Sequence, residues 1–191
     1  AARREDTLRR IVPLILAAVL VFVVTRSLTL AMPLERDEGE YAYIAQRLLL
    51  GETPYLDQFN QKTPGIFGAY ATLFAVLGES VFAVHAALAI CTLLTGAMLW
   101  RVVQRLAGAG AAARAALLFA LASVDPRLLA TAANTEHLGN LGLTLGALAC
   151  IELRRARSLK YSVMCGLGMA SACAFKQVAA LPAAWIGAMG L

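Results

Sequence analysis

Long apolar runs alternate with short polar segments along this chain of 191 residues. The first run, 11–30, is long enough to cross the ~30 Å hydrocarbon layer of a membrane, because a helix rises about 1.5 Å per residue. Further apolar runs follow at 81–100, 111–124, from 138 onwards, 161–175 and 179–191. This pattern predicts an all-α fold, a polytopic bundle of membrane helices.

A polar, aromatic and turn-rich segment at 36–65 separates the first run from the later ones. From Asp37 onwards its apolar residues recur at helical spacing, which predicts a short amphipathic helix. Asp37 is the expected N-cap, with Glu40 at the third position as its capping-box partner. Gly51 is placed to end the helix in a left-handed conformation. Such a helix is too short to span, so we expect it to lie along the membrane surface.

The apolar run at 65–78 is short for a span, and its placement decides the topology of everything after it. If it lies on the surface as a second interfacial helix, all later basic clusters share the side of the N-terminus. These clusters contain Arg101, Arg105, Arg154, Arg155, Arg157 and Lys160. The positive-inside rule places that side in the cytoplasm. We therefore predict a cytoplasmic segment 1–10 and a membrane module 11–191, in which 31–80 is an outer loop with two interfacial helices.

The two ends of the chain carry expectations of their own. Basic residues precede the first apolar run, as in a signal peptide, but the run is long and no small-residue cleavage site follows it. A retained signal anchor is therefore expected. The last apolar run reaches Leu191 with no polar tail behind it. This favours a further C-terminal part beyond the sequence given.

Composition supports a membrane protein and argues against two other classes. The chain is 60% hydrophobic with a mean hydropathy of +0.69, more apolar than one soluble core of this size requires. Its net charge of +5 is spread over the ends of apolar runs, so no nucleic-acid partner is expected. The four cysteines lie in apolar segments without a CxxC pair, which favours neither a disulfide framework nor a zinc site. No glycine-rich phosphate loop is present, and no cofactor or metal is expected.

In the predicted topology, three groups of polar residues meet on the outer side. The first group is Arg36, Asp37 and Glu38 together with Lys62. The second is the segment from Asn134 to His137, which contains Glu136, and the third is Lys176 with Gln177. Ionisable groups at the membrane boundary are costly unless they are paired, solvated or functional, so this convergence predicts a site. Simpler roles stay open: Asp37 as a helix cap and Lys62 as a solvated loop lysine. Glu136 could likewise cap a helix, and Lys176 could extend towards the interface.

The stretch from Asp37 to Ser80 resembles the first outer loop of the GT-C glycosyltransferases, in particular the protein O-mannosyltransferases and lipid A aminoarabinose transferases. The shared order is an acidic pair, Asp37-Glu38, a surface helix that contains Tyr41-Ala42, a G-x-x-P-Y-x-D turn at 51–57, and a lysine before proline, Lys62-Thr63-Pro64. Three positions depart from that pattern. Thr63 replaces a proline, Gln61 stands where some relatives have an acid, and His85 stands where many have arginine. The metal of some relatives is accordingly not expected.

The resemblance implies an inverting glycosyltransferase of a bacterial inner membrane. It would move a sugar from a polyprenyl-phosphate donor to a lipid or protein acceptor on the outer face, among membrane lipids. Asp37, with Glu38, would be the catalytic carboxylate, and Lys62 would contact the carrier phosphate. The other converging residues, Arg36, Asn134, Glu136 and Lys176, are predicted to bind substrate.

Two alternatives remain open from the residues. A transporter or flippase subunit would place charges near the middle of its spans, whereas these lie near the outer ends. A non-catalytic scaffold with the same fold is the other.

Overall fold

The computed structural model describes residues 2–190, and within them the chain is built from α-helices with no β-strand. The helices are α1 (Ala2–Thr29), α2 (Arg36–Leu49), α3 (Pro64–Leu77), α4 (Val81–Ala107), α5 (Ala109–Ala122), α6 (Thr135–Ala156), α7 (Leu159–Phe175) and α8 (Ala180–Gly190). Two short 3-10 turns, Pro126–Leu128 and Gln177–Ala179, precede α6 and α8. The all-α prediction is confirmed. Leu191, the predicted end of the last apolar run, lies outside the described residues.

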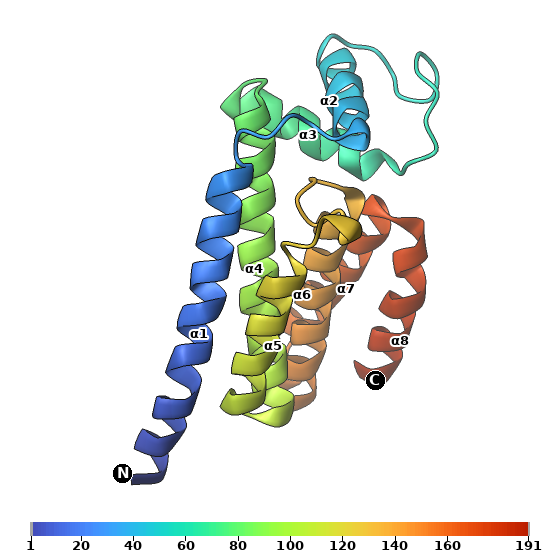
Figure 1. The fold of residues 1–191 in the computed structure, drawn as a ribbon. Helices are drawn as coiled ribbons and strands as arrows, with labels where there is room; N and C mark the ends of the chain where they lie inside the picture. Colours follow the sequence, from blue (N-terminus) through green and yellow to red (C-terminus); the bar gives the residue numbers. More distant parts are fainter. Residues whose placement is uncertain (1, 191) are drawn as a thin grey trace.

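The long helices run side by side, while α2 and α3 lie together at one end of them (Figure 1). We call this the α2–α3 end. Helices α1, α5 and α7 run towards it, and α4, α6 and α8 run away from it (Figure 1). At the opposite end, Arg105 of α4 pairs with Glu152 of α6 at 2.8 Å. The basic residues at 101–105 and 154–160 therefore lie far from α2 and α3.

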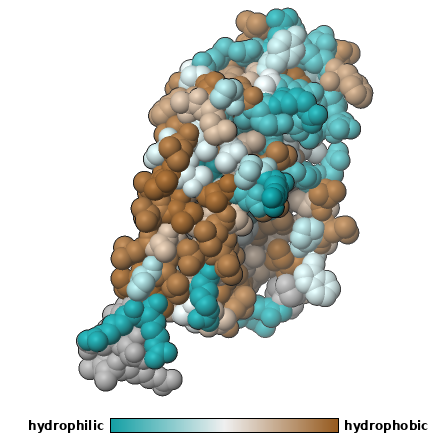
Figure 2. Space-filling view, in the orientation of Figure 1, coloured by the Kyte–Doolittle hydropathy of each residue, from teal (hydrophilic) through white to brown (hydrophobic). Residues whose placement is uncertain are grey.

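Two helical stretches are long and apolar enough to cross a membrane, Arg9–Thr29 and Val81–Ala107. They correspond to the predicted spans at 11–30 and 81–100. Three of the other predicted segments form shorter apolar helices, at Ala109–Ala122, Leu159–Phe175 and Gln177–Ala188. The segment from 138 onwards lies in α6, which has 22 residues but is not among the apolar candidates, and the crossing of all four stays a prediction. Leucines on α1 are not covered by other helices: Leu16 is 62% exposed and Leu20 is 63% exposed. Figure 2 shows hydrophobic side chains covering this flank of the bundle and hydrophilic ones gathered at its ends.

Helix α2 begins differently from the prediction. Its N-cap is Glu35, whose carboxylate accepts a hydrogen bond from the Asp37 backbone N–H at 2.9 Å. Glu38 completes the capping box by accepting from the Glu35 N–H at 2.8 Å. The expected cap at Asp37 with Glu40 is therefore wrong, and the Asp37 carboxylate does not cap the helix. At the other end Gly51 adopts φ +92°, the left-handed conformation predicted for it.

An aromatic core holds α2 on α3. Tyr41 of α2 is fully buried and packs edge-on against Tyr70 of α3, with ring centroids 5.7 Å apart. The Tyr70 hydroxyl donates a hydrogen bond to the Ala133 carbonyl at 2.9 Å. Because Ala133 lies two residues before the first residue of α6, this contact also fixes the start of α6 beneath α2 and α3.

Helices α6 and α7 approach each other at backbone distance. A Cβ on Gly142 would lie 2.7 Å from the Gly168 carbonyl oxygen, so only glycine fits there. The antiparallel pair brings the first turn of α6 beside the last turn of α7. Residues near 136 and 176 consequently lie together at the α2–α3 end.

Candidate active site

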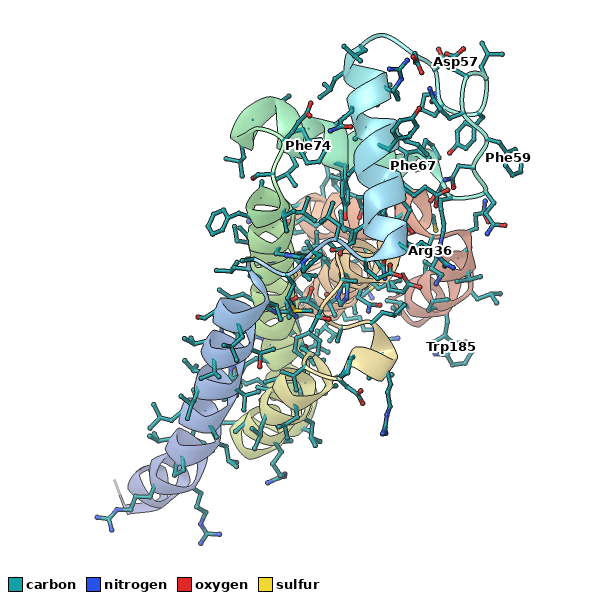
Figure 3. All side chains as sticks on the ribbon, turned by 45° about the horizontal axis from the view of Figure 1, so that its top comes forward. Arg36, Asp57, Phe59, Phe67, Phe74 and Trp185 are labelled. Atoms are coloured by element: carbon teal, nitrogen blue, oxygen red, sulfur yellow. The ribbon has the colours of Figure 1, made fainter. Side chains whose placement is uncertain are left out.

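Asp37 lies in the first turn of α2, close to the bundle, where Figure 3 shows its neighbour Arg36. Its two carboxylate oxygens have different partners. Oδ1 accepts hydrogen bonds from Arg36 Nε at 3.1 Å and Nη2 at 2.9 Å. Oδ2 lies 3.2 Å from Lys62 Nζ and 3.4 Å from the Tyr41 hydroxyl. The carboxylate is mostly shielded, with 19% of the side chain exposed.

The backbone of Lys62 is held from both sides by its own loop. Its N–H donates to Asn60 Oδ1 at 2.9 Å, and its carbonyl accepts from the Tyr55 hydroxyl at 2.6 Å. Tyr55 itself adopts φ +72°, an uncommon conformation for a residue other than glycine, and its ring packs edge-on against Phe67. The Lys62 ammonium lies 5.8 Å from the centre of the Tyr41 ring. The lysine is thus a positioned group and not a freely solvated one.

This arrangement shifts the pKa values of both partners towards the charged forms. Burial alone would raise the pKa of the Asp37 carboxyl, but hydrogen bonds from Arg36 and Lys62 outweigh it and lower that pKa below its ordinary value. Burial would lower the pKa of Lys62, but its contacts with Tyr41 and Asp37 raise it instead. At neutral pH the pair is therefore a carboxylate beside an ammonium.

A second ion pair lies nearby, between Glu136 of α6 and Lys176 at the end of α7. Thr135 supports it by donating a hydrogen bond to Glu136 Oε2 at 2.9 Å. Between the two pairs is a cavity of about 210 Å³, which we call the lysine cavity. It is lined by Gln61, Lys62, Thr63, Thr135, Phe175, Lys176, Gln177 and Val178.

Close packing of α3 on α7 sets the width of the lysine cavity. Gly65, three residues after Lys62, approaches the last turn of α7 so closely that a Cβ would lie 2.8 Å from the Ala174 carbonyl carbon. Ala174 is two residues before Lys176. The contact therefore fixes the start of α3 against the end of α7, with one lysine beside each.

The lysine cavity suits an anionic group. Two ammonium groups line it together with hydroxyl and amide side chains, and ammonium groups are common partners of phosphate. Asp37, in contact with Lys62, is an ionised carboxylate that can accept a proton. An anion bound by Lys62 would therefore lie close to Asp37, the carboxylate that can act as a base.

The structure places two predicted site residues away from the cavity. Glu38 is 1% exposed, and its Oε1 accepts from the Ala133 N–H at 2.6 Å and lies 3.3 Å from His85 Nε2. With Oε2 occupied by the Glu35 N–H, both oxygens hold the fold together. Asn134 is also buried, and its Oδ1 has no hydrogen-bond partner among the described residues. Arg36 contacts Asp37 while remaining largely solvent-exposed.

Reasoning from the sequence missed Arg26. This residue ends the first apolar run yet is 5% exposed, and its Nη2 donates to Thr92 Oγ1, Ser123 O and Ala130 O at 3.1, 3.2 and 3.1 Å. It therefore ties α1 to α4 and to the loop that leads into α6. The position of Arg26, just inside the end of an apolar run and away from the basic clusters, is the sequence feature that could have indicated a buried, hydrogen-bonded arginine.

Comparison with known proteins identifies a family. Residues 61–188 match the family described as dolichyl-phosphate-mannose-protein mannosyltransferase. The matched region covers more than half of the chain and includes Lys62, Glu136 and Lys176, while Asp37 precedes it. No curated protein and no solved structure matches the chain. The family match confirms the resemblance that was drawn from residues 37–80.

Proposed function

Because this chain belongs to the dolichyl-phosphate-mannose-protein mannosyltransferase family, within the GT-C superfamily, we propose that its lysine cavity receives the phosphate of a polyprenyl-phosphate sugar. Family membership and the two apolar helices support a membrane glycosyltransferase in general. The identity of the donor, the acceptor class and the outer-face location belong to our proposal.

In the proposed reaction Asp37 is the general base. The proton of an acceptor hydroxyl passes to Asp37 while the hydroxyl oxygen bonds to the anomeric carbon of the sugar. The bond between that carbon and the phosphate oxygen breaks, and its electron pair leaves with the polyprenyl phosphate. Attack opposite the leaving group inverts the anomeric centre. Lys62 and Lys176 offset the negative charge that develops on the phosphate.

The observation that carries this proposal is the lysine cavity beside an ion-paired carboxylate. Lys62 and Lys176 come from separate elements and line one space, and Asp37 contacts Lys62 at 3.2 Å. Arg36 orients Asp37 through Oδ1, and Glu136 holds Lys176. For Glu38 we propose a positioning role, because its bonds to Ala133 and Glu35 join α2 to the start of α6. Asn134 would contact substrate only after a local rearrangement.

The proposed orientation follows from charge. The basic clusters lie at the end of the bundle away from α2 and α3, so the positive-inside rule puts the lysine cavity on the outer face. Helices α2 and α3 would then lie in the membrane interface. We propose that the protein lies in a bacterial inner membrane. Its acceptor substrate would be a lipid or a protein.

Sugar transfer from a synthetic polyprenyl-phosphate donor tests the proposal. The intact protein in lipid nanodiscs is compared with Lys176→Gln and with the control Lys160→Gln, an exposed lysine at the opposite end of the bundle. We expect Lys176→Gln to raise the KM for donor at least several-fold and Lys160→Gln to leave it unchanged. Equal donor KM values in all three proteins would overturn the assignment of the cavity.

A further inference from the structure

The two oxygens of Asp37 are held by different cations, and only one of these cations lines the lysine cavity. Arg36 bonds Oδ1 through two nitrogens, and its side chain points to solvent with 87% exposed. Lys62 bonds Oδ2 and also lines the cavity. A ligand that enters the cavity therefore contacts Lys62, the partner of Oδ2, and leaves the contact between Arg36 and Oδ1 in place.

Lys62 can serve two anions because an ammonium has three N–H donors. One donor is directed to Asp37 Oδ2 at 3.2 Å. An anion in the cavity would engage the others, and its negative charge would cancel part of the attraction between Lys62 and Asp37. We propose, on the basis of the function proposed above, that the donor phosphate takes over Lys62 and so releases Asp37 Oδ2 to act as the base.

This sharing of Lys62 makes the base dependent on the donor. In the empty protein Oδ2 is occupied by Lys62 and Tyr41, and Asp37 is a weak base. In the donor complex Lys62 leaves Oδ2, so that the neutral Tyr41 hydroxyl is its remaining partner, while Arg36 still orients the carboxylate through Oδ1. The acceptor hydroxyl then loses its proton only when a sugar is in place to receive the oxygen. The order of binding is consequently donor first.

Proton linkage makes the proposal measurable without turnover. An anion that takes Lys62 raises the pKa of Asp37, so by reciprocity protonation of Asp37 strengthens anion binding. Affinity should then rise as the pH falls below about 5, through the ordinary pKa of an aspartic acid, because the pKa of Asp37 in the empty protein lies lower still. Other titratable groups face the same region: Glu35 at the N-cap of α2, Arg36 and Tyr41 on α2, Glu38 with His85 beneath it, and Glu136 with Lys176 across the cavity.

The probe is a polyprenyl phosphonate analogue of the donor, in which a CH₂ group replaces the glycosidic oxygen so that no transfer occurs. Its affinity is measured between pH 7 and about pH 3, a range that spans the ordinary pKa of an aspartic acid, for the intact protein in nanodiscs and for Asp37→Asn, Glu136→Gln and Lys62→Gln. We expect Asp37→Asn to bind about tenfold tighter than the parent at pH 7, because asparagine, like a protonated Asp37, has no negative charge to compete with the phosphate for Lys62. The rise in affinity at low pH should be smaller in Asp37→Asn than in the parent, because only the Glu136–Lys176 pair then contributes to it, and it should persist in Glu136→Gln.

The possible outcomes separate the two proposals. Equal affinity and equal pH dependence in the parent and Asp37→Asn would overturn the sharing of Lys62 while leaving the lysine cavity as the donor site. Binding that is insensitive to Lys62→Gln would overturn the proposed function itself. Retention of cooperative thermal unfolding in each variant shows that an altered affinity reflects the site and not unfolding.

Discussion

At the α2–α3 end, four side chains form two carboxylate–lysine pairs. The sequence alone could predict that these residues belong to one site, but not which lysine pairs with which carboxylate. Asp37 and Lys62 are 25 positions apart, and Glu136 and Lys176 are 40 apart. The packing of α2 on α3 and of α6 on α7 decides which lysine meets which carboxylate. The N-cap of α2 is Glu35, whereas residue preferences, which favour aspartate over glutamate at this position, predict Asp37.

We predict that Asp37→Asn abolishes sugar transfer while the protein stays folded. Asparagine keeps the shape of the side chain, and α2 keeps its capping box through Glu35 and Glu38. It cannot accept the proton, so the rate should fall at least about 100-fold, the usual contribution of a general base. The assay is transfer from a synthetic polyprenyl-phosphate donor, with helix content followed by circular dichroism. Near-normal turnover would exclude Asp37 as the base.

For Lys62 the expected result is a rank order of donor use: parent, then Lys62→Arg, then Lys62→Ala. Arginine preserves the positive charge facing the phosphate but differs in shape, whereas alanine removes the charge. The ratio of kcat to KM for the donor measures this order. A Lys62→Ala protein as active as the parent would make Lys62 an ordinary loop lysine, despite its contacts with Asp37 and Tyr41.

At the scale of helices, the apolar runs predicted the elements well because burial and helix periodicity are local properties of a sequence. The predicted segments 81–100, 111–124 and 161–175 correspond to α4, α5 and α7. The contacts between helices were not predictable in the same way. Close approaches such as that of Gly142 to Gly168 depend on which faces meet, and a glycine in an apolar run does not identify its partner.

The approach of α3 to α7 yields a prediction with a matched control. Gly65→Ala should push the start of α3 away from Ala174 and widen the lysine cavity, because the new Cβ would lie 2.8 Å from the Ala174 carbonyl carbon. We expect the donor KM to rise several-fold. Gly68→Ala, on the same helix, adds a Cβ with no described atom within 4 Å and should leave the donor KM unchanged. Equal effects of the two substitutions would contradict this role for Gly65.

For the whole molecule, the arrangement of helices agrees with the charge pattern from which the topology was predicted. Both ends of α3 contact α2: Lys62 precedes α3 and pairs with Asp37, and Glu79 follows it and accepts from Gln46 Nε2 at 2.7 Å. Segments 61–63 and 79–80 therefore lie at the same end of the bundle. The positive-inside rule predicts that this end faces the outer side of the membrane.

Single cysteines test the topology. They are placed at Gln61, Ser80 and Ser158 in a version lacking the four native cysteines, and intact cells are treated with a membrane-impermeant thiol reagent. We expect labelling at positions 61 and 80, on the outer face, and protection at 158, on the cytoplasmic face. Protection at 80 together with labelling at 158 would show that residues 65–78 cross the membrane and that the proposed orientation is wrong.

The pairing of each cavity lysine with its own carboxylate also affects how the protein discriminates among anions. A free inorganic phosphate must compete with Asp37 for Lys62 and with Glu136 for Lys176, so charge alone gives it little advantage. A polyprenyl phosphate brings an additional gain of about 0.8 kcal/mol for each methylene group that its chain buries in an apolar environment. Millimolar salts should then be poor inhibitors, and lipid attachment, more than phosphate recognition, would decide which anions occupy the cavity.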